Sequence, residues 1–315
     1  MPNTMTFAFT SARMPHHLSR EEGGEAPERK REHKSVMTAE VLSALAVKDG
    51  EVVVDATYGR GGHSAALKKA AKIKLIALDA DPDGKTVSSN GAGPAVVEAN
   101  FGDLKKVLGA QKVDKVLFDL GWNMTQLQSG RGFSFMRDEP LNMSYAASPR
   151  SGFTAAEALN IWSEETLADV LFGYGEERYA RRIAKAIVAR RKVQPFATTN
   201  ELVEVVRDAV PAAYRRGRIN PATKTFQALR IAVNDELGCL KQGLFAAWEA
   251  LTPGGRIAVI TFHSIEDRIV KRYFSSLAKE ESGKLLYKKP LAPSAAEIKS
   301  NLASRSAKLR AIEKI

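Results

Sequence analysis

The stretch "EVVVDATYGRGGHSAALKKAAKIKLIALDAD", residues 51–81, decides the fold class. It begins with a β-branched run that ends in a glycine-rich turn, continues with a helical pattern and closes with the second apolar run "KLIALDAD". A strand, a turn, a helix and a further strand are the start of a βαβ series, which predicts a parallel sheet covered on both faces. Ligands of such sheets bind at the carboxyl ends of the strands.

The same alternation continues as far as Gly121 and then stops. Residues 95–101 and 113–121 predict a third and a fourth strand, and "GGRIAVITFHS", residues 254–264, predicts a later one. Residues 123–222 contain helical patterns without a convincing strand. We therefore predict an α/β domain, residues 33–122 and 223–315, that is interrupted by an inserted helical domain, residues 123–222. Residues 1–32 have the composition of a disordered tail.

The net charge of +11 is concentrated in two stretches. Residues 175–192 hold 7 Lys and Arg against 2 acids, and residues 268–315 hold 12 against 4. Two basic stretches suit a polyanion such as nucleic acid, with ordinary solvated helix faces as the alternative. No run of 18 apolar residues occurs, so we expect no membrane span.

The cysteine and histidine content limits the chemistry further. The single cysteine, Cys239, excludes an intrachain disulfide and fits a reducing compartment, so we expect a cytoplasmic protein. The five histidines and one cysteine do not stand at ligand spacing, and no metal site is predicted.

The glycine-rich turn "DATYGRGGHS", residues 55–64, allows a ligand to approach the backbone closely. It is not the dinucleotide fingerprint, because Ser64 stands where the last glycine belongs, and it lacks the ending of a P-loop. Asp79 follows Asp55 by 24 residues and ends the second strand, where an acid accepts hydrogen bonds from ribose hydroxyls. This pair fits either a nicotinamide dinucleotide or S-adenosylmethionine.

Asp119 ends the fourth predicted strand and adds a third carboxylate to the same edge of the sheet. The sulfonium and ammonium groups of S-adenosylmethionine are cationic, so Asp55 and Asp119 favour this cofactor. A dehydrogenase is the weaker alternative. In the late motif "TFHSIEDR", Ser264 and Asp267 have the spacing of a capping box, and His263 is either a site residue or a core hydrogen-bonding group.

Nine stretches taken together resemble the bacterial ribosomal RNA small subunit methyltransferase H family, which methylates N4 of a cytidine in the decoding region of 16S ribosomal RNA. They run from His33 to Ala311 in the family's order: "HKSVMTAEVL", "DATYGRGGHS", "LDADPD", "FDLG", "QLQSGRGFSF", "GYGEERYARRIAKAIV", "NPATKTFQALRIAVNDEL", "PGGRIAVITFHSIEDRIVK" and "SRSAKLRA". The resemblance implies a Rossmann-like class I methyltransferase domain that uses S-adenosylmethionine, an inserted helical domain, and the small ribosomal subunit as partner.

The resemblance also implies which residues contact the cofactor. Besides Asp55, they are Gly61, Gly62, His63, Asp79, Phe101, Asp119 and Gln126. Phe101 is expected to form one wall of the adenine pocket, with a core position as the alternative. Asp119 is also our candidate acceptor for an N–H of the target amine, although it could instead hold only the methionine part of the donor.

The target base must leave its stack, and flipped bases are held by aromatic faces. Trp122 is the candidate for this, with packing between domains as the alternative. Phe133 and Phe135 are expected to anchor their loop, with base stacking as the alternative. The predicted contacts to RNA phosphates are Arg178, Arg181, Arg182, Arg190, Arg191, Lys224 and Arg230.

The sequence departs from the family at residues expected to face the target. "DLGWNMTQLQ" stands for the usual "DLGVSSPQLD", "PLNMSY" for "PLDMRM", and "NPATK" for "HPATR". Two other functions therefore remain as alternatives: methylation of another acceptor such as DNA or protein, and a catalytically idle RNA-binding assembly factor. A homodimer is also left open.

Overall fold

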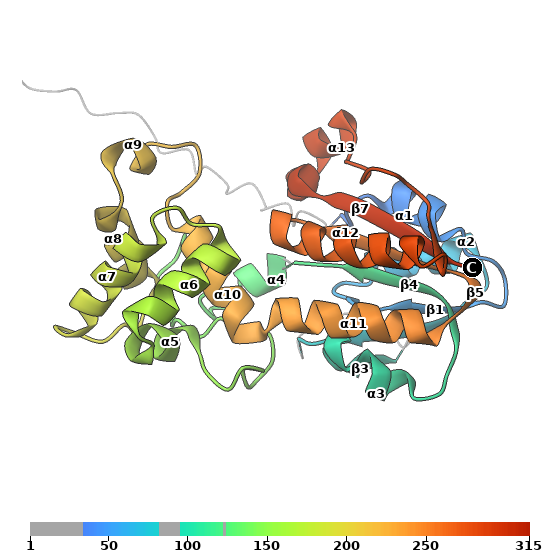
Figure 1. Cartoon of the computed structure of the whole chain (residues 1–315), viewed down its shortest axis with the longest axis horizontal. Helices are drawn as coiled ribbons and strands as arrows, with labels where there is room; N and C mark the ends of the chain where they lie inside the picture. Colours follow the sequence, from blue (N-terminus) through green and yellow to red (C-terminus); the bar gives the residue numbers. More distant parts are fainter. Residues whose placement is uncertain (1–33, 82–94, 122–123) are drawn as a thin grey trace, which may run out of the picture. The chain divides into compact units, whose positions relative to one another are not determined.

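Among the residues that the structure describes, seven strands form one mixed sheet in the order β3-β2-β1-β4-β5-β7-β6 (Figure 1). The structure is a computed structural model that describes residues 34–81, 95–121 and 124–315. The strands are β1 Val52–Asp55, β2 Lys74–Asp79, β3 Val96–Glu98, β4 Val113–Asp119, β5 Leu251–Thr261, β6 Gly283–Leu285 and β7 Lys308–Lys314.

The first five strands are parallel, as the sequence predicts. β7 runs antiparallel between β5 and β6, and neither β6 nor β7 was predicted. The sequence of β7, "KLRAIEK", intersperses charged residues among its apolar ones, where the prediction relied on apolar runs. Ala311 and Ile312 are buried in the cores on opposite faces of the sheet, but two residues are too short a run to indicate a strand.

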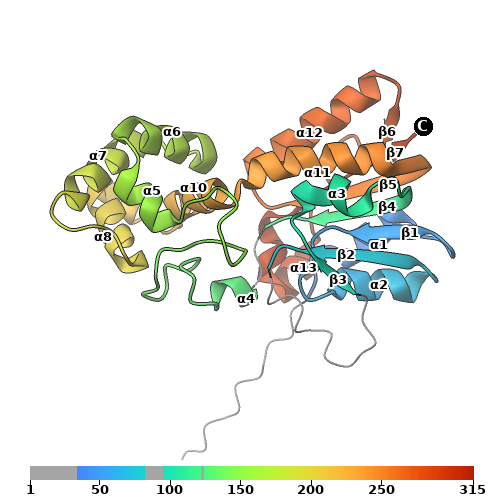
Figure 2. The same cartoon turned by 90° about the horizontal axis from the view of Figure 1, so that it is seen from below.

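Helices cover both faces of the sheet (Figure 2). Helices α1, α2 and α13 lie on one face, and α3, α11 and α12 lie on the other. Their bounds are α1 Thr38–Leu45, α2 Gly62–Ala70, α3 Leu104–Leu108, α11 Glu236–Ala250, α12 Ser264–Lys279 and α13 Ala295–Ser300. Strand side chains alternate between the two cores: Val53 and Leu117 pack toward α1 and α2, whereas Val54 and Phe118 pack toward α11 and α12.

Between β4 and α11 the described residues form helices and loops, with one isolated bridge between Pro140 and Thr198. The helices are α4 Met124–Leu127, α5 Ala155–Ile161, α6 Glu164–Gly175, α7 Ala180–Arg191, α8 Thr199–Ala209, α9 Ala212–Arg215 and α10 Thr223–Asn234. Helices α5–α8 and α10 share a third hydrophobic core, which we call the helical cluster. No described helix is long and apolar enough to cross a membrane.

The position of α10 bears on the predicted end of the inserted domain at residue 222. Phe226, Leu229 and Val233 of α10 are buried in the core of the helical cluster. By packing, α10 therefore goes with the helices before it, not with the sheet. His33–Ile315 is nevertheless one compact unit, and the domain boundaries stay a prediction.

The segment after α4 is anchored by aromatic side chains. The Phe133 ring stacks on Tyr145 with the ring centroids 5.2 Å apart, and Phe135 meets Phe226 edge to face at 5.4 Å. Both phenylalanines belong to the helical cluster, which confirms their predicted role as loop anchors.

Gly132 is the tightest point of this segment. Its φ is +81°, and its N–H donates to the buried carboxylate of Glu139 at 2.9 Å. A Cβ at Gly132 would lie 2.3 Å from the carbonyl oxygen of Pro140. The backbone conformation and the close approach both require glycine at this position.

We predict that Gly132→Ala destabilises the protein more than Gly152→Ala. Gly152 has the same φ of +81°, but nothing lies within 4 Å of its would-be Cβ. The left-handed conformation alone costs about 1–2 kcal/mol, and the clash at Gly132 adds about 1–3 kcal/mol. Urea unfolding of the two variants measures the difference, and equal losses would show that the Pro140 approach is unimportant.

Candidate functional site

Asp55, at the end of β1, is almost completely buried and holds the glycine-rich loop. The Ser64 hydroxyl donates to its Oδ2 at 2.6 Å, and the Thr57 N–H donates to its Oδ1 at 3.3 Å. Burial raises the pKa of Asp55, and the Ser64 hydrogen bond partly opposes this. The observed role of Asp55 is to fix the first turn of α2, and its predicted contact with a cofactor stays a prediction.

Asp79 ties the end of β2 to the same loop. Its carboxylate accepts the Gly59 N–H at 2.7 Å and the Asp81 N–H at 2.8 Å. Burial raises the pKa of Asp79, while these two hydrogen bonds lower it. A carboxylate oxygen accepts more than one hydrogen bond, so the acid keeps capacity for ribose hydroxyls.

Gly61 and Gly62 are required by close neighbours. Gly61 precedes α2 with φ +72°, and a Cβ there would lie 2.5 Å from the Tyr58 hydroxyl. A Cβ at Gly62 would lie 2.0 Å from Oγ of Ser35. Because these two positions have no side chain, the loop packs closely against Tyr58 and against Ser35, which precedes α1.

The buried His63 and the partly buried Asp119 form a pair that brings the glycine-rich loop to the end of β4. His63 Nε2 lies 3.3 Å from Asp119 Oδ2, and the two side chains are 7% and 22% exposed. The approach is an ion-pair contact and not a well-formed hydrogen bond, since both ring nitrogens and Asp119 Oδ1 have no hydrogen-bond partner among the described residues. The Asp119 N–H donates to Thr57 Oγ1 at 2.7 Å, which fixes the strand end.

The electrostatics favour the charged form of the histidine. Burial lowers the pKa of His63, but Asp119, Asp55 and Glu297 together outweigh burial, and the pKa is raised. The neighbouring carboxylates thus favour the protonated form of His63.

The residues at this edge fit the predicted methyl donor. Buried polar atoms in folded proteins normally have partners, and Asp119 Oδ1 lacks one among the described residues. A carboxylate there suits a cationic sulfonium or ammonium group, and Asp79 suits ribose hydroxyls. Gln126, on α4, is also buried.

Two predicted site residues remain open. Phe101 opens a short 3-10 helix, packs edge-on against Phe118 at 5.9 Å and contacts the core below α11. Because its ring is only partly buried, the core position and the adenine-wall interpretation both stand. Trp122 lies outside the described residues.

Arg131 joins the segments that follow β2 and β4. Its guanidinium lies 2.5 Å from the buried Asp81 carboxylate and donates to the carbonyl oxygens of Ser144 and Tyr145. The sequence patterns did not predict a role for Arg131. Its position next to two glycines within "SGRGF" is the only local signal.

The motif "TFHSIEDR" starts a helix as predicted, but the predicted capping residues are wrong. His263 is the N-cap of α12, and Glu266 closes the capping box by accepting the N–H of Phe262 at 2.9 Å and of His263 at 3.3 Å. Asp267 instead forms two hydrogen bonds with Arg310. Tertiary partners therefore decide which of two equally spaced pairs forms the cap.

Arg230 is not available as the predicted phosphate contact. It is 8% exposed and donates two hydrogen bonds to Glu236, at 2.7 and 2.9 Å. The Tyr145 hydroxyl donates to the same carboxylate at 3.0 Å. The apolar residues around Arg230 on α10 bury it, and the ion pair then satisfies its charge.

Glu236, His263 and Glu266 bring possible ligand atoms within 4.8 Å of one another, a grouping that the sequence did not predict. The grouping alone does not make a metal site, because the Arg230 guanidinium already neutralises Glu236. We interpret these side chains, with Tyr145, as a buried ionic network between α10, α11 and α12.

The other predicted phosphate contacts fall into two groups. Arg190, Arg191 and Lys224 are partly buried and donate to protein carbonyl groups, those of Gln194, Leu159 and Glu176 respectively. Arg181 and Arg182 are exposed on α7, and the exposed Arg178 lies over the rings of Tyr179 and Tyr214, 4.8 Å from each centroid. The second group keeps its charge accessible to a polyanion.

The strand order, the glycine-rich loop after β1 and the acids that end β1, β2 and β4 fit a Rossmann-like methyltransferase domain that uses S-adenosylmethionine. Residues 30–315 match the MraW methylase family, and the chain belongs to that family.

Curated relatives agree over nearly the whole length. The chain is 44% identical to ribosomal RNA small subunit methyltransferase H from Carboxydothermus hydrogenoformans, covering 90% of this chain and 98% of that protein. It is 43% identical to the protein of the same name from Heliobacterium modesticaldum, with the same coverage. An rRNA methylase structure from Streptococcus thermophilus is more distant, with a TM-score of 0.40 and 13% identity over 88% of this chain and 93% of that chain.

We predict that Asp119→Asn lowers the pKa of His63, because burial then acts on the imidazolium with less compensating charge. Glu297→Gln is the matched control and lowers it less, since Glu297 contributes least among the acids. NMR titration of the ring measures both shifts; equal shifts would contradict the pairing.

In the wild type, the raised pKa means that the pair stabilises the fold fully below about pH 6.5, and that this contribution is lost as pH rises through the pKa of His63.

We predict that Arg230→Ala destabilises the fold by about 3–5 kcal/mol, because it leaves a buried carboxylate without its partner. Arg181→Ala is the control and leaves the free energy of unfolding within about 0.5 kcal/mol, because Arg181 is exposed. Chemical denaturation measures the free energy of unfolding of both variants. An equally small effect of the two substitutions would show that Arg230 behaves as an exposed arginine and would contradict the buried ion pair.

Proposed function

We propose that the protein transfers a methyl group from S-adenosylmethionine to N4 of a cytidine in 16S ribosomal RNA, within the small ribosomal subunit. Family membership supports the reaction type, and the names of the relatives support the ribosomal substrate. The exposed arginines of α7 support a polyanionic acceptor.

The observation that carries this proposal is the position of Asp119 at the end of β4. Its Oδ2 faces His63, while its Oδ1 has no hydrogen-bond partner among the described residues. One oxygen is thus held in place, and the other is available for an N–H donor. An amino group of a base brings such a donor.

The chemistry explains why an acceptor matters. The lone pair of the exocyclic amine of cytosine is drawn into the ring, so the amine is a poor nucleophile. S-adenosylmethionine supplies an electrophilic methyl group on a sulfonium. Asp119 accepts a hydrogen bond from an N–H of the amine. This concentrates the lone pair on nitrogen and aligns the amine with the methyl group. The methylated nitrogen is cationic until it releases its proton, which the Asp119 carboxylate accepts.

His63 acts through Asp119 as a positioning residue. In its charged form it holds Oδ2 in a fixed direction and compensates a carboxylate that would otherwise be buried alone. Gly61 and Gly62 let the loop that carries His63 fold closely enough to make this contact.

The helical cluster is the proposed RNA-recognition part, in line with the predicted inserted domain. Arg178, Arg181 and Arg182 are its candidate phosphate contacts, and such contacts position an RNA without specifying its sequence. The stacking role of Trp122, the homodimer and the cytoplasmic location stay predictions.

We predict that purified protein with labelled donor methylates small ribosomal subunits and that mass spectrometry of the digested RNA finds N4-methylcytidine. Asp119→Asn lowers the rate by about 100-fold or more, because it removes the acceptor charge. Asp169→Asn, an exposed acid on α6, is the control and keeps the wild-type rate.

The outcomes separate this function from its alternatives. Transfer only to DNA or to a protein would replace the ribosomal substrate. A lack of calorimetric binding of S-adenosylmethionine would favour an idle RNA-binding factor, and normal transfer by Asp119→Asn would overturn the proposed mechanism.

A further inference from the structure

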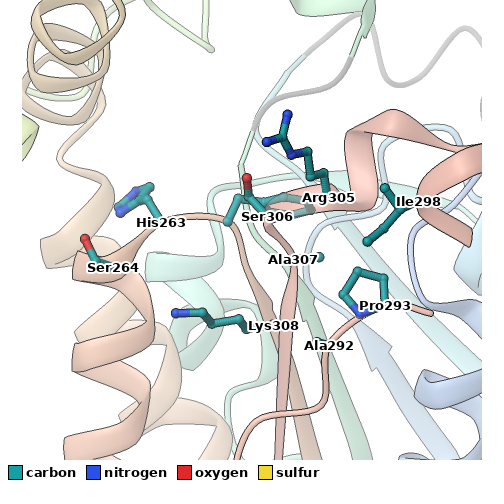
Figure 3. A pocket seen from close by; sticks show the side chains of 10 residues that line it. His263, Ser264, Ala292, Pro293, Ile298, Arg305, Ser306, Ala307 and Lys308 are labelled. Atoms are coloured by element: carbon teal, nitrogen blue, oxygen red, sulfur yellow. The ribbon is translucent and has the colours of Figure 1, made fainter. Parts of the chain in front are cut away.

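A cavity opens beside β5 and β7, which we call the β5–β7 pocket (Figure 3). Its volume is about 380 Å³, within the range of sites that hold small ligands. The residues around the start of α12, the start of β7 and the segment from Pro293 to Ile298 line it. None of its lining residues belongs to the predicted cofactor site.

The pocket lies at the same edge of the sheet as Asp119. Because β7 is antiparallel, its first residue, Lys308, pairs with Thr261, the last residue of β5. Phe262 then lines the pocket and also abuts Gly121, where a Cβ would lie 3.2 Å from the phenylalanine ring. Phe262 thus contacts both the pocket and Gly121, two residues after the end of β4.

The sheet order puts the pocket and the cofactor residues on opposite sides of β4. β1 and β2, which end in Asp55 and Asp79, lie on one side of β4, and β5 and β7 lie on the other. A donor held over β1 and β2 therefore leaves the β5 side for the acceptor. This arrangement points to a substrate group, not to the donor, as the occupant.

The lining is chemically suited to a phosphate. Lys308 is 3.5 Å from Asp267, and that carboxylate also accepts two hydrogen bonds from Arg310. Because one carboxylate faces two cations, the three side chains together carry a net positive charge. Arg305 is exposed at the mouth, and Ser306 lies beside it. Two cations and a hydroxyl are the groups that proteins use to hold backbone phosphates of nucleic acids.

One wall of the pocket is apolar. Pro293 and Ile298 lie on one side of the cavity, and Lys308 points away from them toward Ser264 (Figure 3). A purely ionic surface would bind inorganic anions and RNA alike, whereas an apolar wall also packs against a sugar or a base. The combination favours a nucleotide unit of a single strand over a free anion.

We propose that the β5–β7 pocket binds a backbone phosphate of the ribosomal RNA next to the methylated cytidine, with Lys308 and Arg305 pairing with the phosphate oxygens. This rests on the proposed function and adds the group that places the target strand. Phosphate binding on the β5 side then brings the neighbouring base to Asp119 on β4.

The test compares Arg305→Gln, Lys308→Gln and the double variant with a matched control, Arg272→Gln combined with Lys279→Gln, two exposed cations of α12 outside the pocket. The double variant raises the KM for small ribosomal subunits about 10-fold or more, while the Kd of S-adenosylmethionine is unchanged. The slope of log binding constant against log salt falls by about 1, because one phosphate contact is lost. Arg305→Gln alone gives a smaller effect in the same direction, and its exposed position makes misfolding an insufficient explanation.

Three results would overturn the proposal. They are a KM equal to that of the control, a weaker affinity for S-adenosylmethionine, and a salt slope that does not change. If the wild type itself transfers no methyl group to ribosomal RNA, the proposed function fails first, and that result is distinguishable because it does not depend on either cation.

Discussion

Burying several carboxylates at one edge of a sheet is the constraint on which the site depends. β1, β2 and β4 are adjacent and parallel, so Asp55, Asp79 and Asp119 necessarily end together. Removing such charges from water is costly unless each is compensated. A Ser64 hydroxyl, two backbone N–H groups and the ring of His63 provide that compensation. The glycine-rich loop is the element that delivers all of them except the N–H of Asp81.

Local patterns were enough to predict the strands that carry these acids and the break after Gly121. Apolar runs, turn residues and the rule that parallel strands end at one edge are all properties of neighbouring residues. The antiparallel β7, the His63–Asp119 pair and the His263 cap of α12 could not be derived in the same way. Each depends on a partner that is distant in sequence or on a choice between equivalent local partners.

The cations illustrate the same limit. Charge density in a sequence predicts a polyanion partner but does not say which side chains reach it. Arg230 and Arg181 both come from motifs that resemble the family, yet Arg230 is enclosed by the apolar face of α10 and neutralised by Glu236, while Arg181 projects from α7. Burial, which follows from helix packing, separates a structural arginine from an available one.

β4 is the divide between the two halves of the site. The acids and the loop that suit a methyl donor lie on its β1 side, and the cationic pocket lies on its β5 side. Asp119 ends the dividing strand, which places its carboxylate between the two sides. Two residues on, Gly121 has φ +102° and leaves space for the Phe262 ring, which forms the near wall of the pocket. A larger residue at Gly121 would push this wall outward. The glycine therefore fixes how closely a phosphate-bound strand approaches the carboxylate.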